Sequence, residues 1–72
     1  MSFLTLKLAR KSPSGKTDVF TVENSYNGSV LGEIRFYGAW RKYCFFPGAG
    51  TLFDAKCLAE LAALLDKTNG KP

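Results

Sequence analysis

Apolar and polar residues alternate over most of the chain, and the period changes only near the C-terminus. In residues 3–9, FLTLKLA, three leucines point to one side while Thr5 and Lys7 point to the other. This period of two residues is typical of a half-buried strand. The same pattern recurs three more times, with turn residues such as Pro13, Gly15 and the Asn27-Gly28 pair in between. We therefore predict strands at residues 3–9, 18–25, 30–37 and 40–46.

A helical period begins near Asp54 and predicts one helix over residues 54–67. Asp54 is a favourable N-cap, and Phe53 before it is placed to pack on Leu58; Thr51 is the alternative cap. Asn69-Gly70 ends the helix. At 100° per residue an apolar face gathers on one side and a polar face on the other. The apolar face consists of Cys57, Leu58, Leu61, Ala62, Leu64 and Leu65, and the opposite face of Lys56, Glu60, Ala63 and Lys67.

Four strands joined by short connections and followed by one helix predict an α+β fold. We expect a four-stranded antiparallel meander sheet with the C-terminal helix packed on one face, forming a single domain over residues 1–72. One helix covers only one face of such a sheet. The opposite face must then meet solvent, a ligand or another copy of the chain.

The segment FYGAWRKYCFFPG, residues 36–48, concentrates six aromatic rings, and its turn decides which of them face outward. A two-residue turn at Gly38-Ala39 places Tyr43 on the helix side, leaves Trp40 on the open side, and sets Arg35 opposite Lys42. A three-residue turn reverses the faces of this last strand, because a shift of one residue exchanges them. Both alternatives remain open at the level of sequence. Each leaves some aromatic ring beside an arginine or lysine on the open face.

Length and composition exclude several classes of protein. A chain of 72 residues with 46% hydrophobic and 22% charged residues is typical of a small globular domain and not of a disordered chain. The longest apolar runs are far shorter than the ~20 residues of a membrane-spanning helix. The N-terminus lacks the pattern of a signal peptide. We therefore expect a cytoplasmic protein with no membrane partner.

Candidate catalytic chemistry is sparse. The chain has no histidine, and its six acidic residues are scattered without a pair spaced for acid–base catalysis. Two cysteines, Cys44 and Cys57, are too few for a zinc site. A cytosolic location favours two reduced thiols, mostly buried, over a disulfide. We predict a protein that is not an enzyme, with no catalytic residues, no bound metal and no cofactor.

The net charge of +4 is unevenly placed and suggests an anionic partner. Exposed aromatic rings stack on nucleic-acid bases, and neighbouring cations neutralise phosphates. We therefore predict a binding surface for single-stranded nucleic acid or a signalling nucleotide. Its residues are Arg35, Tyr37, Trp40, Arg41, Lys42 and Tyr43, and a secondary basic loop comprises Arg10, Lys11 and Lys16.

A protein–protein interface is the alternative function for the same face. Its rings would then be covered by a second copy in a homodimer, or by another protein that this chain inhibits. Salt separates the two functions, because binding to phosphates weakens steeply as salt rises.

The stretch LGEIRFYGAWRKYCFFP, followed by TLFDAKCLAEL, resembles a group of small phage and prophage proteins. Their pattern has a glycine, an isoleucine, an aromatic-Tyr pair, Trp-Arg, Tyr, Phe and Pro, then a Cys-Leu pair opening a helix. Phe36 stands where tryptophan is commoner in that group. The resemblance covers about half of the chain and implies a phage accessory protein in the host cytoplasm, without an assigned activity. A protein that this chain inhibits would then be a host protein. The matching residues are Gly32, Ile34, Phe36, Tyr37, Trp40, Arg41, Tyr43, Phe45, Pro47, Cys57 and Leu58.

Overall fold

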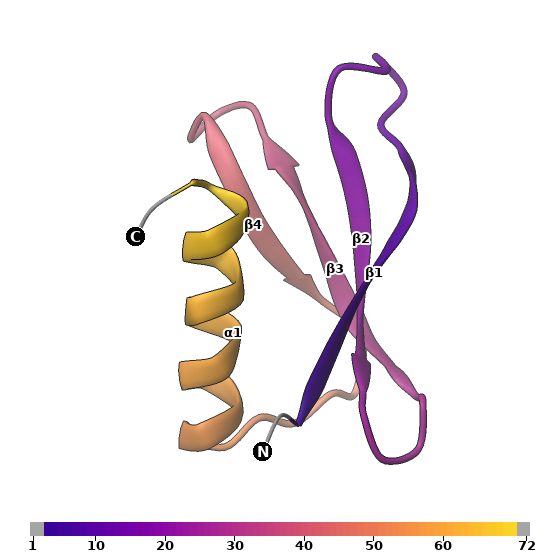
Figure 1. Cartoon of the computed structure of the whole chain (residues 1–72), viewed down its shortest axis with the longest axis vertical. Helices are drawn as coiled ribbons and strands as arrows, with labels where there is room; N and C mark the ends of the chain where they lie inside the picture. Colours follow the sequence, from indigo (N-terminus) through magenta and orange to yellow (C-terminus); the bar gives the residue numbers. More distant parts are fainter. Residues whose placement is uncertain (1–2, 71–72) are drawn as a thin grey trace.

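The predicted α+β architecture is confirmed by a computed structural model, which describes residues 3–70 (Figure 1). Four strands form one antiparallel sheet in the order β1-β2-β3-β4, so the sheet is a meander. One C-terminal helix, α1, follows the last strand. The elements are β1 (Leu4–Lys11), β2 (Asp18–Asn24), β3 (Val30–Tyr37), β4 (Lys42–Pro47) and α1 (Ala55–Thr68).

The last strand is where the predicted boundaries differ most from the structure. β4 begins at Lys42 and not at residue 40, because residues 38–41 form a four-residue turn. Tyr37 pairs with Lys42, so neither the two-residue nor the three-residue turn is correct. A four-residue turn preserves the faces of the two-residue alternative, since the register differs by two residues. It also sets Arg35 opposite Cys44 and avoids the repulsion that Lys42 would cause there.

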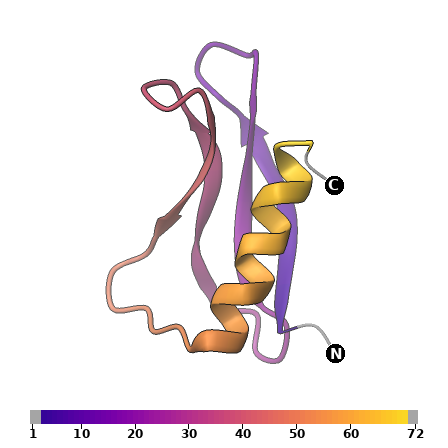
Figure 2. The same ribbon diagram turned by 90° about the vertical axis from the view of Figure 1, so that its left-hand side faces the viewer.

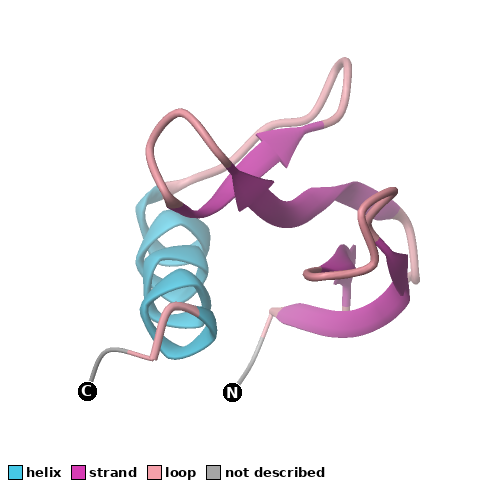
Figure 3. Ribbon diagram, turned by 90° about the horizontal axis from the view of Figure 1, so that it is seen from above, coloured by secondary structure: helices cyan, strands magenta, loops and turns pink. Residues whose placement is uncertain are grey.

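The helix contacts both edges of the sheet, which curls so that β1 and β4 turn toward it (Figure 3). At β1, the Glu60 carboxylate accepts hydrogen bonds from the N–H groups of Phe3 (2.9 Å) and Leu4 (3.0 Å). At β4, the Asn69 side chain accepts from Tyr43 N–H at 2.8 Å and donates to Tyr43 O at 3.2 Å. The predicted placement of Glu60 on the helix face opposite the apolar face is therefore wrong.

The core lies between the concave sheet face and α1, and it is narrower than predicted. Its buried members come from three strands and the helix: Leu4, Val22, Ile34 and Leu61. Leu64 and Leu65 pack against this cluster, but Leu58 is 52% exposed and Ala62 is exposed as well. Phe53, which we expected to pack on Leu58, has its ring in edge contact with Phe45, at 5.5 Å between centroids.

Gly32 is the one core position where a side chain has no room. A Cβ atom built there would lie 2.5 Å from the Phe46 carbonyl oxygen and 2.7 Å from the Phe45 ring. The Phe45 ring therefore occupies the space above Gly32 in β3. Any larger residue at position 32 would displace this ring.

The helix ends form at the predicted residues. Asp54 is the N-cap, and its carboxylate accepts a hydrogen bond from Cys57 N–H at 2.9 Å, which excludes Thr51 as the cap. This bond lowers the pKa of Asp54 below its ordinary value of 3.8. Asn69 is the C-cap, and Gly70 follows with φ 76°. Glycine tolerates this left-handed conformation without strain.

Three chain segments meet at one end of the molecule. Because the strands of a meander alternate in direction, the β1–β2 and β3–β4 connections lie at the same end of the sheet. The C-terminal end of α1 points toward that end too, since the helix runs in the opposite direction to β4 (Figure 2). Among the described residues, this end carries most of the basic side chains: Arg10, Lys11, Lys16, Arg41, Lys42 and Lys67.

Candidate functional site

The β3–β4 turn projects its residues because of an unusual backbone conformation. Trp40 N–H donates to Tyr37 O and Arg41 N–H donates to Gly38 O, both at 3.2 Å. Arg41 has φ 53° and is the one non-glycine residue of the described range with positive φ. This conformation turns the chain into β4 and leaves Trp40 66% exposed.

Three aromatic rings form a continuous cluster. Tyr37 and Phe46 lie on the sheet face away from α1, called here the outer face, and Trp40 adjoins them from the β3–β4 turn, where it also lines a hollow with Leu65 and Asn69. The Tyr37 ring meets Trp40 edge-on at 5.4 Å and Phe46 edge-on at 6.1 Å, measured between centroids. The Arg35 guanidinium carbon lies 3.8 Å from the centroid of the Phe46 ring, a cation–π contact. Residues of two adjacent strands and their turn thus form one aromatic–basic patch, defined as Arg35, Tyr37, Trp40, Arg41, Lys42 and Phe46.

The charges of the patch are only partly neutralised. Arg35 Nε lies 3.8 Å from Glu33, which also receives Arg10 at 3.1 Å. Arg41 and Lys42 form no ion pair with any residue of the described range 3–70. Both are exposed at the turn, so the end of the patch that carries Trp40 also carries its two unneutralised cations.

One predicted member of the site lies on the other face. Tyr43 pairs with Phe36 and points toward α1, where its hydroxyl accepts a hydrogen bond from Asp18 N–H at 3.3 Å. Phe46, absent from the predicted set, takes its place on the outer face. The two-residue turn places Tyr43 on the helix side and Phe46 on the outer face, as observed. However, it also pairs Arg35 with Lys42, which is repulsive. A four-residue turn, which removes the repulsion, was the missing alternative.

The secondary basic loop is more dispersed than predicted. Arg10 lies on β1 and is paired with Glu33, while Lys11 donates to Asp18 at 2.6 Å. This hydrogen bond raises the pKa of Lys11 above its ordinary value of 10.5. Only Lys16 lies at the hairpin tip without an ion pair among the described residues. Lys16 therefore extends the basic end, whereas Arg10 and Lys11 serve mainly to balance the acids of β2 and β3.

On β1 and β2, the charged side chains of the outer face form ion pairs with each other. Lys7 on β1 lies 3.3 Å from Glu23 on β2. Val19, between its cross-strand neighbours Arg10 and Arg35, is only 3% exposed although it faces away from the helix. The β1–β2 half of this face thus offers no exposed ring, and the aromatic rings are confined to the β3–β4 half.

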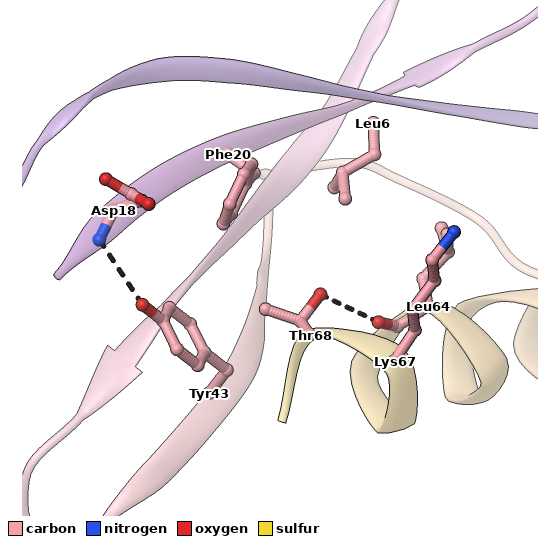
Figure 4. Close-up of a pocket in the computed structure, with 7 residues that line it drawn as sticks. All are labelled: Leu6, Asp18, Phe20, Tyr43, Leu64, Lys67 and Thr68. Carbon is pink, nitrogen blue, oxygen red and sulfur yellow. Dashed lines mark hydrogen bonds between the residues drawn. The ribbon is translucent and has the colours of Figure 1, made fainter. Parts of the chain in front are cut away.

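The helix side of the sheet contains a cavity of about 510 Å³ near the C-terminus of α1 (Figure 4). Leu6, Phe20 and Leu64 supply its apolar wall. The Tyr43 hydroxyl points into the cavity from β4. The Thr68 hydroxyl donates to Leu64 O at 2.8 Å, so its hydrogen already has an acceptor within the helix. Asp18 and Lys67 complete the lining. The cavity therefore combines an apolar interior with polar groups at its rim.

The cysteines lie apart from any metal-binding group. Within residues 3–70 no cluster of three or more His, Cys, Asp or Glu side chains could hold a metal ion. Both thiols are free and each is half-buried, so they are less buried than predicted. A hydrogen bond with the Asp54 carboxylate raises the pKa of Cys57, which favours the neutral thiol over the nucleophilic thiolate.

Comparison of the chain with models of known protein families, with curated proteins and with solved structures gave no match. In the part of the chain that the structure describes, no helix has the length and apolar character needed to cross a membrane.

Proposed function

We propose that the aromatic–basic patch binds single-stranded nucleic acid without catalysing a reaction. One observation carries this proposal. Trp40, the most exposed ring of the aromatic cluster, stands next to Arg41 and Lys42, two cations without an ion pair among the described residues. A base would stack on Trp40 while the two cations contact the flanking phosphates.

The arrangement favours a flexible single strand over a duplex. The patch follows the short β3–β4 hairpin and contains no helix that would enter a major groove. Stacking on aromatic rings needs unpaired bases, which single strands supply. Because every base has a π-face, we expect weak sequence preference.

A fluorescence-anisotropy titration with labelled oligothymidylate tests the proposal at several salt concentrations. Replacing Arg41 by Gly and Lys42 by Ala should flatten the salt dependence by about 0.7 in log–log slope for each phosphate that the protein no longer neutralises. Trp40→Ala should weaken binding by about 1–3 kcal/mol per stacked base, with little change in that slope. Lys56→Ala and Leu52→Ala, at the opposite end of the molecule, serve as matched controls and should leave binding unchanged.

Three outcomes would argue against this function. The first is a wild-type protein that does not bind the oligonucleotide at low salt. The second is an unchanged affinity in both patch variants, which would move the site elsewhere. The third is full competition by a mononucleotide at equal affinity, which would identify a small nucleotide as the ligand in place of a strand.

A protein–protein interface is the second candidate for the same patch, and the 66% exposure of Trp40 favours it. Aromatic residues are enriched in such interfaces. In that case the association would persist or strengthen as salt rises, and sedimentation of the purified protein would report a dimer if the partner were a second copy.

A further inference from the structure

Trp40 lines two hollows at the β4 edge of the sheet. The first, of about 300 Å³, is shared with Tyr37 and Phe46 of the outer face. The second, of about 400 Å³, lies between β4 and the last turn of α1, where Phe45 and Leu65 supply an apolar wall. A strand bound at the aromatic–basic patch thus meets two hollows that share the Trp40 ring.

The second hollow, called here the β4–α1 hollow, has polar groups held in place by the end of the helix. Asn69 accepts a hydrogen bond from Tyr43 N–H at 2.8 Å and donates one to Tyr43 O at 3.2 Å, which fixes the last helical turn against β4. Asp66 stands three positions before Asn69, so the two side chains are neighbours on the helix surface. Both line the hollow and are presented together to a ligand there.

These two side chains keep hydrogen-bonding capacity that no described residue uses. Within residues 3–70, Asp66 takes part in no ion pair, and both of its carboxylate oxygens remain acceptors. The Asn69 amide nitrogen carries two hydrogens, of which one is donated to Tyr43 O. Its second hydrogen has no acceptor in the described part of the chain. The β4–α1 hollow therefore offers two acceptors beside one donor.

Guanine is the base whose Watson–Crick edge complements this set. It presents an acceptor, O6, followed by two donors, N1–H and the N2 amino group. The Asp66 carboxylate would accept both donors, while the Asn69 amide donates to O6. Thymine, cytosine and adenine each place an acceptor atom next to their donor. Each would therefore set a lone pair against a carboxylate oxygen, which leaves the carboxylate poorly satisfied.

The charges around the hollow favour a base inside it over a phosphate. Asp66 would repel a phosphate, whereas an uncharged base with donor groups would be attracted. Lys42 also lines the hollow, and Arg41 precedes it in the turn; neither forms an ion pair with a described residue. These two cations are left for the phosphates that flank the bound base.

We propose that the β4–α1 hollow binds one unpaired guanine of the strand, whose Watson–Crick edge is read by Asp66 and Asn69 while a neighbouring base stacks on Trp40. The guanine site rests on the proposed function, because the cations at the turn hold the strand in place. It adds selectivity at one nucleotide position to the weak preference that stacking alone provides.

Oligothymidylate with a single central deoxyguanosine tests this site by fluorescence anisotropy, with unsubstituted oligothymidylate as the reference. We expect the guanine to strengthen binding about tenfold, the discrimination typical of a bidentate contact. Asp66→Asn should abolish most of this gain, because its amide group replaces one acceptor by a donor. Lys67→Ala is the matched control: Lys67 lines the other cavity, so the ratio of the two affinities should stay unchanged.

Modified bases test the same contacts in the unaltered protein. Deoxyinosine, which lacks the N2 amino group, should lose most of the gain, whereas a guanine whose N7 is replaced by carbon should keep it. The Asn69 side-chain amide resonances should shift on binding the guanine oligonucleotide and not on binding oligothymidylate.

The outcomes separate this site from the function of the patch. Equal binding of the guanine and thymine oligonucleotides, or inosine binding as tightly as guanine, would overturn the guanine site and leave the Trp40-dependent binding intact. A protein that binds none of these oligonucleotides would overturn both.

Discussion

Arg41 adopts a conformation that few residues other than glycine accept. Its φ of 53° places it in the left-handed region, which costs an L-residue with a side chain roughly 1–2 kcal/mol. An arginine at this position gains nothing for the fold from its charge, since it has no ion pair among the described residues. Under the proposed function, the strain is offset by a cation placed beside Trp40.

Replacing Arg41 by glycine should therefore stabilise the protein and weaken oligonucleotide binding. We expect an increase of about 0.5–1 kcal/mol in the free energy of unfolding, because relief of strain exceeds the extra flexibility of the unfolded chain. Urea denaturation measures it. Lys42→Gly is the matched control: Lys42 lies in a strand without positive φ, so glycine there should destabilise the fold. If Arg41→Gly lowered the free energy of unfolding, this would show that the Arg41 backbone is not strained in the folded protein.

The helix owes its start to a single carboxylate, which makes its stability depend on pH. The pKa of Asp54 is lowered in the folded protein because the charged form accepts the Cys57 N–H. A lowered folded pKa means that this stabilisation is fully present above the ordinary value of 3.8 and is lost as pH falls through the lowered value.

Asp54→Ala should accordingly lower the melting temperature at neutral pH and lose this effect in acid. Thermal unfolding monitored by circular dichroism from pH 7 to pH 2 measures the difference between variant and wild type. The two curves should start to approach each other below pH 3.8 and should converge as pH falls through the lowered pKa of Asp54, where the wild-type carboxylate becomes protonated. Asp54→Asn, which keeps an acceptor oxygen without a titrating group, is the control and should lower the melting temperature less at neutral pH. A difference that stays constant down to pH 2 would show that Asp54 acts through something other than its charge.

Contacts between the first strand, β1, and the C-terminal helix, α1, hold the sheet and the helix together. Glu60 joins α1 to the N–H groups of Phe3 and Leu4, more than fifty positions away in sequence. This tie and the Asn69–Tyr43 pair hold the two sheet edges against one helix. The small core of Leu4, Val22, Ile34 and Leu61 is enclosed as a result.

Glu60→Ala should lower the free energy of unfolding by about 1.5–3 kcal/mol, the range for hydrogen bonds to a charged group. Glu60→Gln, which retains an acceptor oxygen, should cost less. Hydrogen exchange at Phe3 and Leu4 should accelerate in the alanine variant, since the edge opens there first. Unchanged exchange at these two amides would show that β1 is held by its side chains alone.

The sequence by itself determined the four strands, the helix, its C-terminal end and the meander order, and it reduced the N-cap to Asp54 or Thr51. These features follow from local patterns: the period of two or 3.6 residues, the Asp54 and Asn69-Gly70 signals, and short connections. It also identified the patch residues that lie within residues 35–42. It included Tyr43, however, where the structure has Phe46.

Only the tertiary structure decided the register of β4 and the closure of the sheet. The register depends on the backbone of the turn, where an arginine takes the left-handed conformation that sequence rules reserve for glycine. Glu60 looked like an ordinary solvent-facing acid, because its partners lie at the other end of the chain. Local periodicity specifies which residues form each element, whereas contacts between distant segments arise only when the sheet curls around its helix.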